Sequence, residues 1–444
     1  MTRYHARWVL PVTSAPIRDG TVVVRDGRLT WVGTRADAPD DAADVDLGDV
    51  MLMPGLVNAH CHLELTAMRG FLDGLGFRDW ILRLTAARRA VLTPAMLLDA
   101  ARLGVDEGLR HGVTTFADTG DTGAGFDAML ERGVRGICYR EVFGPDPVQC
   151  DDAIAGLEGR IDEMQQRATP LVAVGVSPHA PYTVSDALFR ATASLARTRG
   201  LPLAVHIAES ELESALVEHA RGGFADGLRA RDIEVVRRAR SPIALLEALG
   251  VLDARALLIH CVRANDADVE AIARHGAAVA HCPASNAKLG HGIAPLAAFM
   301  AAAIRVGIGT DSVASNDRMD LLDEARLASL FATAREHRHD TLSAAGALEL
   351  ATLGGAGALG LADRVGSLDV GKDADLAAFP LPPHRMPIHD PVAAAVFAHA
   401  GQPATFVAVR GRVLVAEGQL VHADADLALR VQAVADLLQG WLAV

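Results

Sequence analysis

Histidines and one aspartate stand at the ends of short apolar runs, in a fixed order along the chain. His60 and His62 close the first run, His206 and His260 close later ones, and Asp311 follows the last. Such runs predict buried strands, and side chains two apart in a strand share a face, so His60 and His62 can reach one ion. Polar groups at the carboxyl ends of successive buried strands are typical of a (β/α)8 barrel active site. The pattern predicts a hydrolase with one metal ion.

Strand and helix signals alternate through the middle of the chain. Eight candidate strands lie at residues 56–62, 113–118, 134–142, 171–178, 203–208, 256–261, 277–282 and 305–310. Regular alternation predicts a parallel sheet, and eight units predict its closure into a barrel. Thr183 and Asp186 form a capping-box pattern that begins one helix, and Gly200 marks its end. The segment from Glu211 to Leu249 is longer than one helix needs, so we expect an insertion that shapes the pocket.

The two ends of the chain contain strand and turn signals without the helix signals of the middle. Residues 22–33 contain two strand-like runs around Asp26-Gly27, which is a hairpin signal, and residues 406–415 have the same strand–turn–strand pattern around Gly411. We therefore expect both ends to contribute to one small sheet domain. The predicted α/β organisation is a small β-sandwich domain from residues 1–54 and 363–424, a (β/α)8 barrel over residues 55–362, and a C-terminal helix over residues 425–444.

The composition argues against several classes of partner. The net charge of −13 disfavours non-specific nucleic-acid binding, which needs a basic surface. The five cysteines form no CxxC pair and are odd in number, as expected for a reducing compartment. The N-terminus lacks the apolar stretch of a signal peptide, and no segment resembles a membrane span. We expect a cytoplasmic protein that binds a small-molecule substrate and neither nucleic acid nor a membrane, and homodimer formation stays open.

The candidate metal site combines nitrogen and oxygen ligands. His206 and Asp311 would complete the set that His60 and His62 begin. Such a set suits one divalent ion, Zn2+ or Fe2+, of which we expect Zn2+. A plain helix-capping role for Asp311 is the alternative, but its place after an apolar strand favours the site.

A second metal bridged by a lysine is excluded for the first six strands. Only two lysines occur, and the first, Lys288, lies beyond the sixth predicted strand. Glu141, at the end of the third strand, could bridge two metals in principle. We prefer a substrate or structural contact for it.

Proton transfer needs a titratable group beside the metal. Glu209 follows His206 by three residues and could ferry protons to a leaving amine. The rival interpretation is a carboxylate that stabilises a helix N-terminus. His179 closes the fourth predicted strand, where a substrate contact is favoured.

Five segments together resemble one known family. They are Pro54–His62, Ser177–Tyr182, Val205–Glu209, His281–Leu289 and Gly309–Ser312. The chain resembles the amidohydrolase superfamily, in the branch of metal-dependent aminohydrolases that includes deaminases of cytosine, guanine and adenosine-type nucleosides. The similarity covers nearly the whole chain.

This resemblance implies a role for each candidate residue. The metal ligands would be His60, His62, His206 and Asp311. His260 would hydrogen-bond the reacting water or the tetrahedral intermediate, Glu209 would shuttle the proton, and His179 would contact substrate. With Asp311 accepting a proton from water, Glu209, His260 and Asp311 form the expected catalytic set for hydrolytic deamination.

Shorter strings suggest a subgroup. His62-Leu63-Glu64, Glu141–Gly144 and Gly222–Arg229 look like enzymes that deaminate 6-aminodeoxyfutalosine in menaquinone biosynthesis. Adenosylhomocysteine deaminases usually lack the glutamate after the HxH motif. The expected substrate-binding residues are Glu64, Arg140, Glu141 and His179.

The resemblance to this subgroup implies further features of the substrate site. The benzoate of that substrate would need a cation, for which Arg140, Arg69 and Arg83 are candidates. The alternatives are an S-adenosylhomocysteine or methylthioadenosine deaminase, and a cyclic amide or triazine hydrolase of the same superfamily. A non-catalytic scaffold is disfavoured because every metal and proton-transfer residue is retained.

Overall fold

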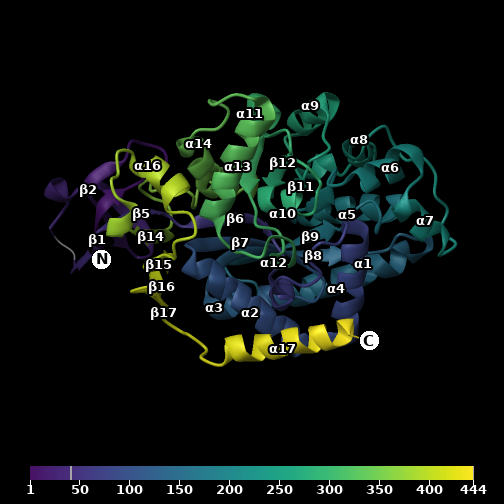
Figure 1. Ribbon diagram of the computed structural model, residues 1–444, viewed down its shortest axis with the longest axis horizontal. Helices are drawn as coiled ribbons and strands as arrows, with labels where there is room; N and C mark the ends of the chain where they lie inside the picture. Colours follow the sequence, from purple (N-terminus) through teal and green to yellow (C-terminus); the bar gives the residue numbers. More distant parts are fainter. Residues whose placement is uncertain (41–42, 444) are drawn as a thin grey trace.

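Eight parallel strands form the central part of the protein. The computed structural model describes residues 1–40 and 43–443 and is drawn in Figure 1. They form two four-stranded sheets, ordered β6-β7-β8-β9 and β10-β11-β12-β13. Their bounds are β6 Leu56–Cys61, β7 Val113–Gly120, β8 Arg135–Val142, β9 Val172–Pro178, β10 Ala204–Ile207, β11 Leu257–His260, β12 Ala278–His281 and β13 Arg305–Ile308. Each strand lies within two residues of its predicted range, because a run buried on both faces is readable as an unbroken apolar stretch.

Backbone contacts join the two sheets at both of their edges. Val176 in β9 pairs in parallel with Leu203 just before β10, and Cys61 at the end of β6 pairs in parallel with Asp311 just after β13. The Asp311 N–H also donates to the His60 carbonyl, at 3.0 Å. The eight strands therefore follow one another around a ring, and the residues that end them meet at one rim.

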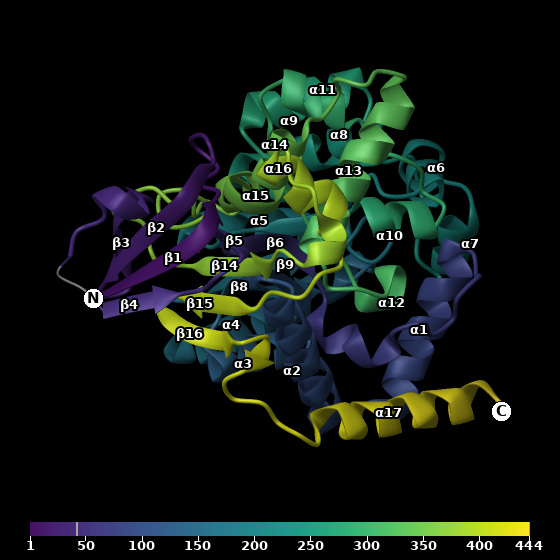
Figure 2. The same cartoon turned by 60° about the vertical axis from the view of Figure 1, so that its left-hand side comes forward.

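Helices connect the strands and cover the outside of this ring (Figures 1 and 2). Their bounds are α1 Phe77–Val91, α2 Pro94–Arg110, α3 Ala124–Arg132, α4 Cys150–Arg167, α5 Asp186–Arg199, α6 Glu211–His219, α7 Gly223–Arg229, α8 Pro242–Ala248, α9 Asp266–His275, α10 Pro283–Lys288, α11 Leu296–Ala301, α12 Val313–Asn316, α13 Leu321–Glu336, α14 Ala344–Glu349, α15 Gly355–Ala358, α16 Pro391–Ala393 and α17 Leu427–Leu442. The long segment after Glu209 holds three of these helices, α6 to α8. In the part of the chain that the structure describes, no helix is long and apolar enough to cross a bilayer.

The start of α5 corrects one sequence expectation. The helix is capped by Ser185, whose hydroxyl accepts the Leu188 N–H, and not by Thr183. Thr183 instead donates to the Ala180 carbonyl and contacts His179, so its side chain is committed to the preceding turn. The predicted end of the helix is confirmed, because Gly200 is its C-cap with a φ of 63°.

Strands from both chain ends form one nine-stranded sheet, as a β-sandwich domain built from both termini requires. Its order is β17-β16-β15-β14-β5-β1-β2-β3, with β4 paired to β1. The bounds are β1 Thr2–Val9, β2 Ile17–Arg25, β3 Arg28–Thr34, β4 Ala43–Asp46, β5 Val50–Pro54, β14 Leu376–Pro380, β15 Phe406–Val409, β16 Arg412–Ala416 and β17 Gln419–Leu420. The sheet lies at one side of the molecule, and α17 runs past α2 and α1 (Figure 2).

A buried ion-pair cluster ties this sheet to the ring of strands. Arg135, the first residue of β8, is 1% exposed. Its Nη2 donates to Asp373 at 2.9 Å, and its Nε donates to Asp375 at 2.8 Å. Both aspartates lie just before β14. Because a buried charge without a partner is costly, this cluster fixes how the two chain ends meet the ring.

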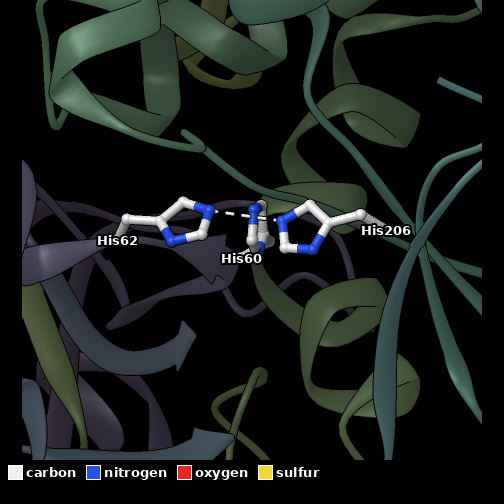
Figure 3. Close-up of side chains that lie close together, drawn as sticks. All are labelled: His60, His62 and His206. Atoms are coloured by element: carbon white, nitrogen blue, oxygen red, sulfur yellow. Dashed lines mark hydrogen bonds between the residues drawn. The ribbon is translucent and has the colours of Figure 1, made fainter. Parts of the chain in front are cut away.

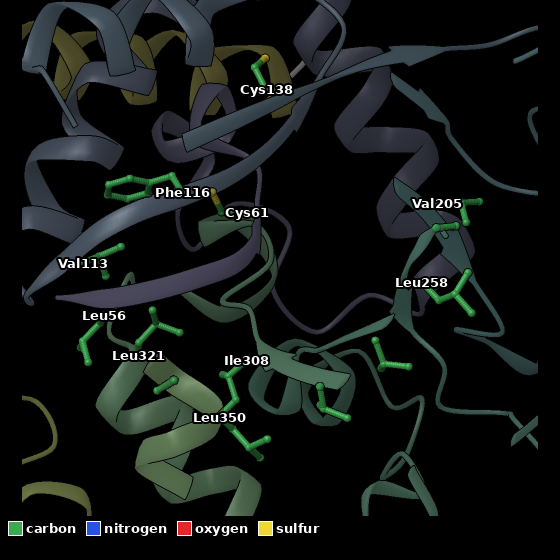
Figure 4. Packing of buried hydrophobic residues seen from close by; sticks show 14 of the residues in the cluster. Leu56, Cys61, Val113, Phe116, Cys138, Val205, Leu258, Ile308, Leu321 and Leu350 are labelled. Carbon is green, nitrogen blue, oxygen red and sulfur yellow. The ribbon is translucent and has the colours of Figure 1, made fainter. Parts of the chain in front are cut away.

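An apolar layer packs against β6 and β13, the strands that precede His62 and Asp311. Leu56 of β6, Val113 of β7 and Ile308 of β13 are fully buried together with Leu321 of α13 (Figure 4). Protein interiors are close-packed, so this layer holds β6 and β13 in a fixed relation. The residues that follow these two strands are thereby held close to each other.

Candidate active site

Three histidines, His60, His62 and His206, converge at the carboxyl ends of the strands (Figure 3), and Asp311 lies beside them. The Nε2 atoms of His62 and His206 are 3.2 Å apart. Asp311 Oδ1 lies 3.2 Å from His60 Nε2 and 3.4 Å from His62 Nε2. Four side chains from β6, β10 and the end of β13 thus point their donor atoms at one place, as the sequence order predicted for a metal site.

The chemistry of these groups fits a divalent cation. The Thr119 carbonyl, 2.9 Å from His62 Nδ1, can only accept, so Nδ1 carries the proton and Nε2 keeps its lone pair. Burial lowers the pKa of His62 to about 3 and holds the pKa of His206 well below its usual value, so both rings are neutral at pH 7. Neutral imidazoles and a carboxylate whose lone pairs face one another are the ligand set of zinc and related ions.

Asp311 is not a helix cap, and its carboxylate is oriented toward the histidine cluster. The hydroxyls of Ser285 and Ser315 both donate to its Oδ2. The cap of α12 is the next residue, Ser312, whose hydroxyl accepts the Ala314 N–H. Burial raises the pKa of Asp311, but the facing histidines outweigh this effect and hold the pKa well below its usual value. The remaining oxygen, Oδ1, is left to face the histidine cluster.

Glu209 is buried beside two histidines. Its Oε1 lies 3.6 Å from His260 Nε2 and 3.2 Å from His291 Nε2. Burial raises its pKa, but the two histidines overcome this and the net pKa lies below the ordinary value. Because α6 begins after its cap Ser210, Glu209 lies outside the helix and does not serve its N-terminus.

The turn that carries Glu209 is fixed by another carboxylate. Glu213, from the first turn of α6, accepts the backbone N–H of Ala208 at 2.9 Å and that of Glu209 at 3.0 Å. Ala208 has a φ of 51°, a backbone conformation that side chains rarely adopt. The two hydrogen bonds hold this strained turn and aim the Glu209 side chain into the pocket. Neither Glu213 nor His291 was expected from the sequence, since loop side chains at these spacings carry no periodic signal.

The expected site residues line one pocket, except for Arg140 and His60, of which His60 lies behind His62 and His206 and is 1% exposed. Its walls include His62, Glu64, Glu141, His179, His206, Glu209, His260 and Asp311. Arg140 is 4% exposed on β8 but is not among the pocket-lining residues. The His179 Nδ1 donates to Thr183 Oγ1 at 2.8 Å, and burial lowers the His179 pKa to about 4, so its Nε2 is an acceptor.

Two arginines that were candidates for binding a carboxylate lie elsewhere. Arg69 is exposed and pairs with Glu107, and Arg83 is exposed on α1. The arginines that line the pocket are Arg88 and Arg89 from the same helix. A helix presents only one face to a neighbouring pocket, and the order of the arginines in the sequence did not show which face of α1 this would be.

The polar end of the pocket is an ion-pair network. Arg88 Nη2 donates to Glu64 at 2.5 Å and also to Asp121, and the Thr122 hydroxyl donates to Glu64. Burial raises the pKa of Glu64 despite Arg88. Burial, with Asp121 and Glu64 nearby, raises the pKa of Glu141 well above its usual value. This end of the pocket is rich in hydrogen-bond acceptors.

Another part of the pocket wall is aromatic and apolar. Phe77, Trp80, Leu84 and Tyr182 line it. Phe224 from α7 stacks on Tyr182 with ring centroids 4.2 Å apart and planes 6° apart. The segment after Glu209 therefore supports the pocket wall, as the long insertion led us to expect.

A ligand cluster of this kind at the rim of a ring of parallel strands defines a metal-dependent hydrolase. The profile of the amidohydrolase family matches residues 51–414, and the chain belongs to this family. It is thus a metal-dependent enzyme that acts on C–N bonds.

Comparison with individual proteins agrees with this assignment. A 5-methylthioadenosine/S-adenosylhomocysteine deaminase of Moorella thermoacetica is 32% identical over 425 residues, covering 94% of this chain and 95% of the relative. The structure of an adenosine deaminase from Xanthomonas campestris with bound zinc superposes with a TM-score of 0.88 and 30% identity, over 99% of this chain and 98% of that one. An aminofutalosine deaminase from Helicobacter pylori shares the fold, with a TM-score of 0.81, 20% identity and coverage of 94% and 100%.

Proposed function

We propose that the protein is a zinc-dependent deaminase of an adenine nucleoside with a 5′ thio substituent, 5′-methylthioadenosine or S-adenosylhomocysteine. The observation that carries the proposal is the buried Glu209 carboxylate, which shares one pocket with His260 and with the cluster of His62, His206 and Asp311. The names of relatives that match the chain over almost its whole length support the choice of substrate.

The reaction replaces an amine by an oxygen. A water oxygen bonds to the adenine carbon that bears the amine, the C–N bond of that amine breaks, ammonia leaves, and hypoxanthine remains. A divalent metal held by His60, His62, His206 and Asp311 would supply Lewis-acid activation of water. Zinc is the ion bound in the similar adenosine deaminase structure.

The chain's own groups would move the protons. Glu209 would take one of the two protons of the attacking water and give it to the ring nitrogen, and Asp311 would take the other and return it to the leaving amine, so that both carboxylates end ionised. His260 is oriented by Asn286, whose Oδ1 accepts from Nδ1 at 2.9 Å. It would hydrogen-bond the oxygen that attacks.

Substrate recognition would use both walls of the pocket. His179 offers a neutral acceptor, and Glu64 with the Arg88 network offers acceptors for hydroxyl groups of the sugar. The aromatic wall around Phe77 and Trp80 suits an apolar thioether. Arg140 could act on substrate only through its neighbours, since it does not line the pocket.

The comparisons favour this substrate over 6-aminodeoxyfutalosine, which the short strings around Glu64 and Glu141 suggested. Several methylthioadenosine/adenosylhomocysteine deaminases are 30–35% identical over 92–95% of the chain, whereas the aminofutalosine deaminase is 20% identical, which supports a shared fold alone. Of the two arginines that line the pocket, Arg88 is engaged by Glu64 and Asp121, so a benzoate would have to pair with Arg89.

A substrate panel tests the proposal. Ammonia release is measured as kcat/KM for methylthioadenosine, adenosylhomocysteine, aminodeoxyfutalosine, adenosine, guanine and cytosine. We expect the two thionucleosides to exceed every other compound by at least about tenfold, the range that one or two pocket contacts give. Preference for aminodeoxyfutalosine would restore the other substrate, and preference for a free base would refute both.

A further inference from the structure

Two buried polar atoms without a hydrogen-bond partner face each other beside the metal-ligand cluster. They are Oε1 of Glu141, at the end of β8, and Nδ1 of His206, on β10. The atoms are 4.0 Å apart, and their side chains are 7% and 6% exposed. A buried polar atom left unpaired costs about 1–3 kcal/mol, so two of them side by side call for a physical reason.

The state of the His206 ring follows from where its other nitrogen points. His206 Nε2 lies 3.2 Å from His62 Nε2, inside the ligand cluster. A neutral imidazole that gives the Nε2 lone pair to a metal carries its proton on Nδ1. That N–H then points toward Glu141. A histidine that binds a metal usually donates its second N–H to a carboxylate or carbonyl, which fixes the tautomer and the ring plane.

Other partners for this N–H fit less well. The nearest ring is that of His179, with centroids 4.8 Å apart and planes 36° apart. His206 Nδ1 makes no hydrogen bond to this ring. Glu141, His179 and His206 could also be taken as a second metal site. That would require lone pairs on both nitrogens of His206, and a neutral imidazole offers one.

We propose that Glu141 is a positioning residue for the metal ligand His206. Its carboxylate accepts the Nδ1–H and thereby holds Nε2 toward the metal. Closing the gap from 4.0 Å to a hydrogen bond of about 2.9 Å needs a shift of roughly 1 Å. The role differs from the substrate contact that the sequence suggested for Glu141. It depends on the metal site and not on which substrate is turned over.

Zinc affinity of the purified protein tests the proposal directly. The metal-free protein is titrated with Zn2+ against a chromophoric chelator, without any substrate. Glu141→Leu removes the acceptor and should weaken zinc binding by about 10- to 100-fold, the usual effect of losing such a partner. Glu141→Gln keeps an acceptor oxygen, so the logarithm of its zinc affinity should fall by less than half as much as in Glu141→Leu.

Glu64→Gln is the matched control. It also removes a buried carboxylate from this pocket, but Glu64 is bonded to Arg88 and Thr122 and not to a ligand. Its zinc affinity should stay within about threefold of wild type. Circular dichroism melts of the three variants establish that each is folded before titration.

Several results would overturn the proposal. One is a folded Glu141→Leu protein that binds zinc within about threefold of wild type while its KM rises, which would make Glu141 a substrate contact. Another is an equal loss in Glu141→Leu, Glu141→Gln and Glu64→Gln, which would mean that only charge matters. A second bound equivalent of zinc that Glu141→Leu abolishes would assign the residue to a second metal. None of these outcomes depends on the substrate panel.

Discussion

Replacing Glu209 by glutamine should abolish most activity and leave the metal in place. The amide has the size of the carboxylate and can keep one of the contacts to His260 and His291, at 3.6 and 3.2 Å. It cannot accept and return a proton. General acid–base groups contribute about 100- to 10,000-fold, or roughly 3–5 kcal/mol of barrier. Because Glu209 is 4% exposed, bulk water cannot replace it, and we expect the upper half of this range.

The assay compares kcat/KM for ammonia release with zinc content measured by elemental analysis on the same samples. Glu211→Gln is the matched control, since Glu211 is an exposed carboxylate in the first turn of α6, where it can interact favourably with the helix dipole. Its activity should stay within about twofold of wild type. If Glu209→Gln with full zinc keeps more than about a tenth of wild-type kcat/KM, Glu209 does not transfer the proton and the mechanism is wrong.

Three further predictions concern the metal and the stability of the fold. Wild type should bind about one divalent metal per chain and His60→Ala should lose both metal and turnover, whereas a requirement for two equivalents would contradict a single-metal site. Arg135→Ala should lower the free energy of unfolding by about 3–5 kcal/mol, because it leaves Asp373 and Asp375 buried without their cation; a loss below 1 kcal/mol in urea melts would argue against that coupling. Burial raises the pKa of Glu324 to about 8, so the folded state binds the Glu324 proton more tightly than the unfolded state does. The stability that this proton contributes is lost as pH rises from about 4.5 to 8. In Glu324→Gln this part of the pH dependence should disappear, and unfolding curves at pH 5 and pH 8 that change as much as in wild type would disprove it.

Much of the architecture is readable from local sequence. A strand buried on both faces is an unbroken apolar run, so the eight central strands, from β6 to β13, could be located to within two residues. Parallel strands in a ring end at the same rim, and for this reason the order of His60, His62, His206 and Asp311 was enough to predict that they meet.

Local sequence was less informative where two signals compete or where a helix face decides. Thr183 and Ser185 are both good capping residues, and only the path of the preceding turn leaves Ser185 as the cap. Arg83 and Arg88 lie on one helix, but its packing turns Arg88 alone of these two into the pocket. The short strings around Glu64 and Glu141 favoured 6-aminodeoxyfutalosine, whereas similarity over the whole chain favours a methylthioadenosine or adenosylhomocysteine substrate. A few pocket residues say little about the part of a substrate that is remote from the reacting ring.

The sequence by itself determined which groups could bind a metal and at which ends of which strands they stand. Only the tertiary structure decided what surrounds those groups. Three sets of contacts join segments far apart in the chain. Glu209 lies beside His291, and Glu141 lies near His206. The hydroxyls of Ser285 and Ser315 donate to Asp311. Such contacts depend on the directions of loop side chains, which no periodicity records, and they are set only when the packed ring brings its loops together.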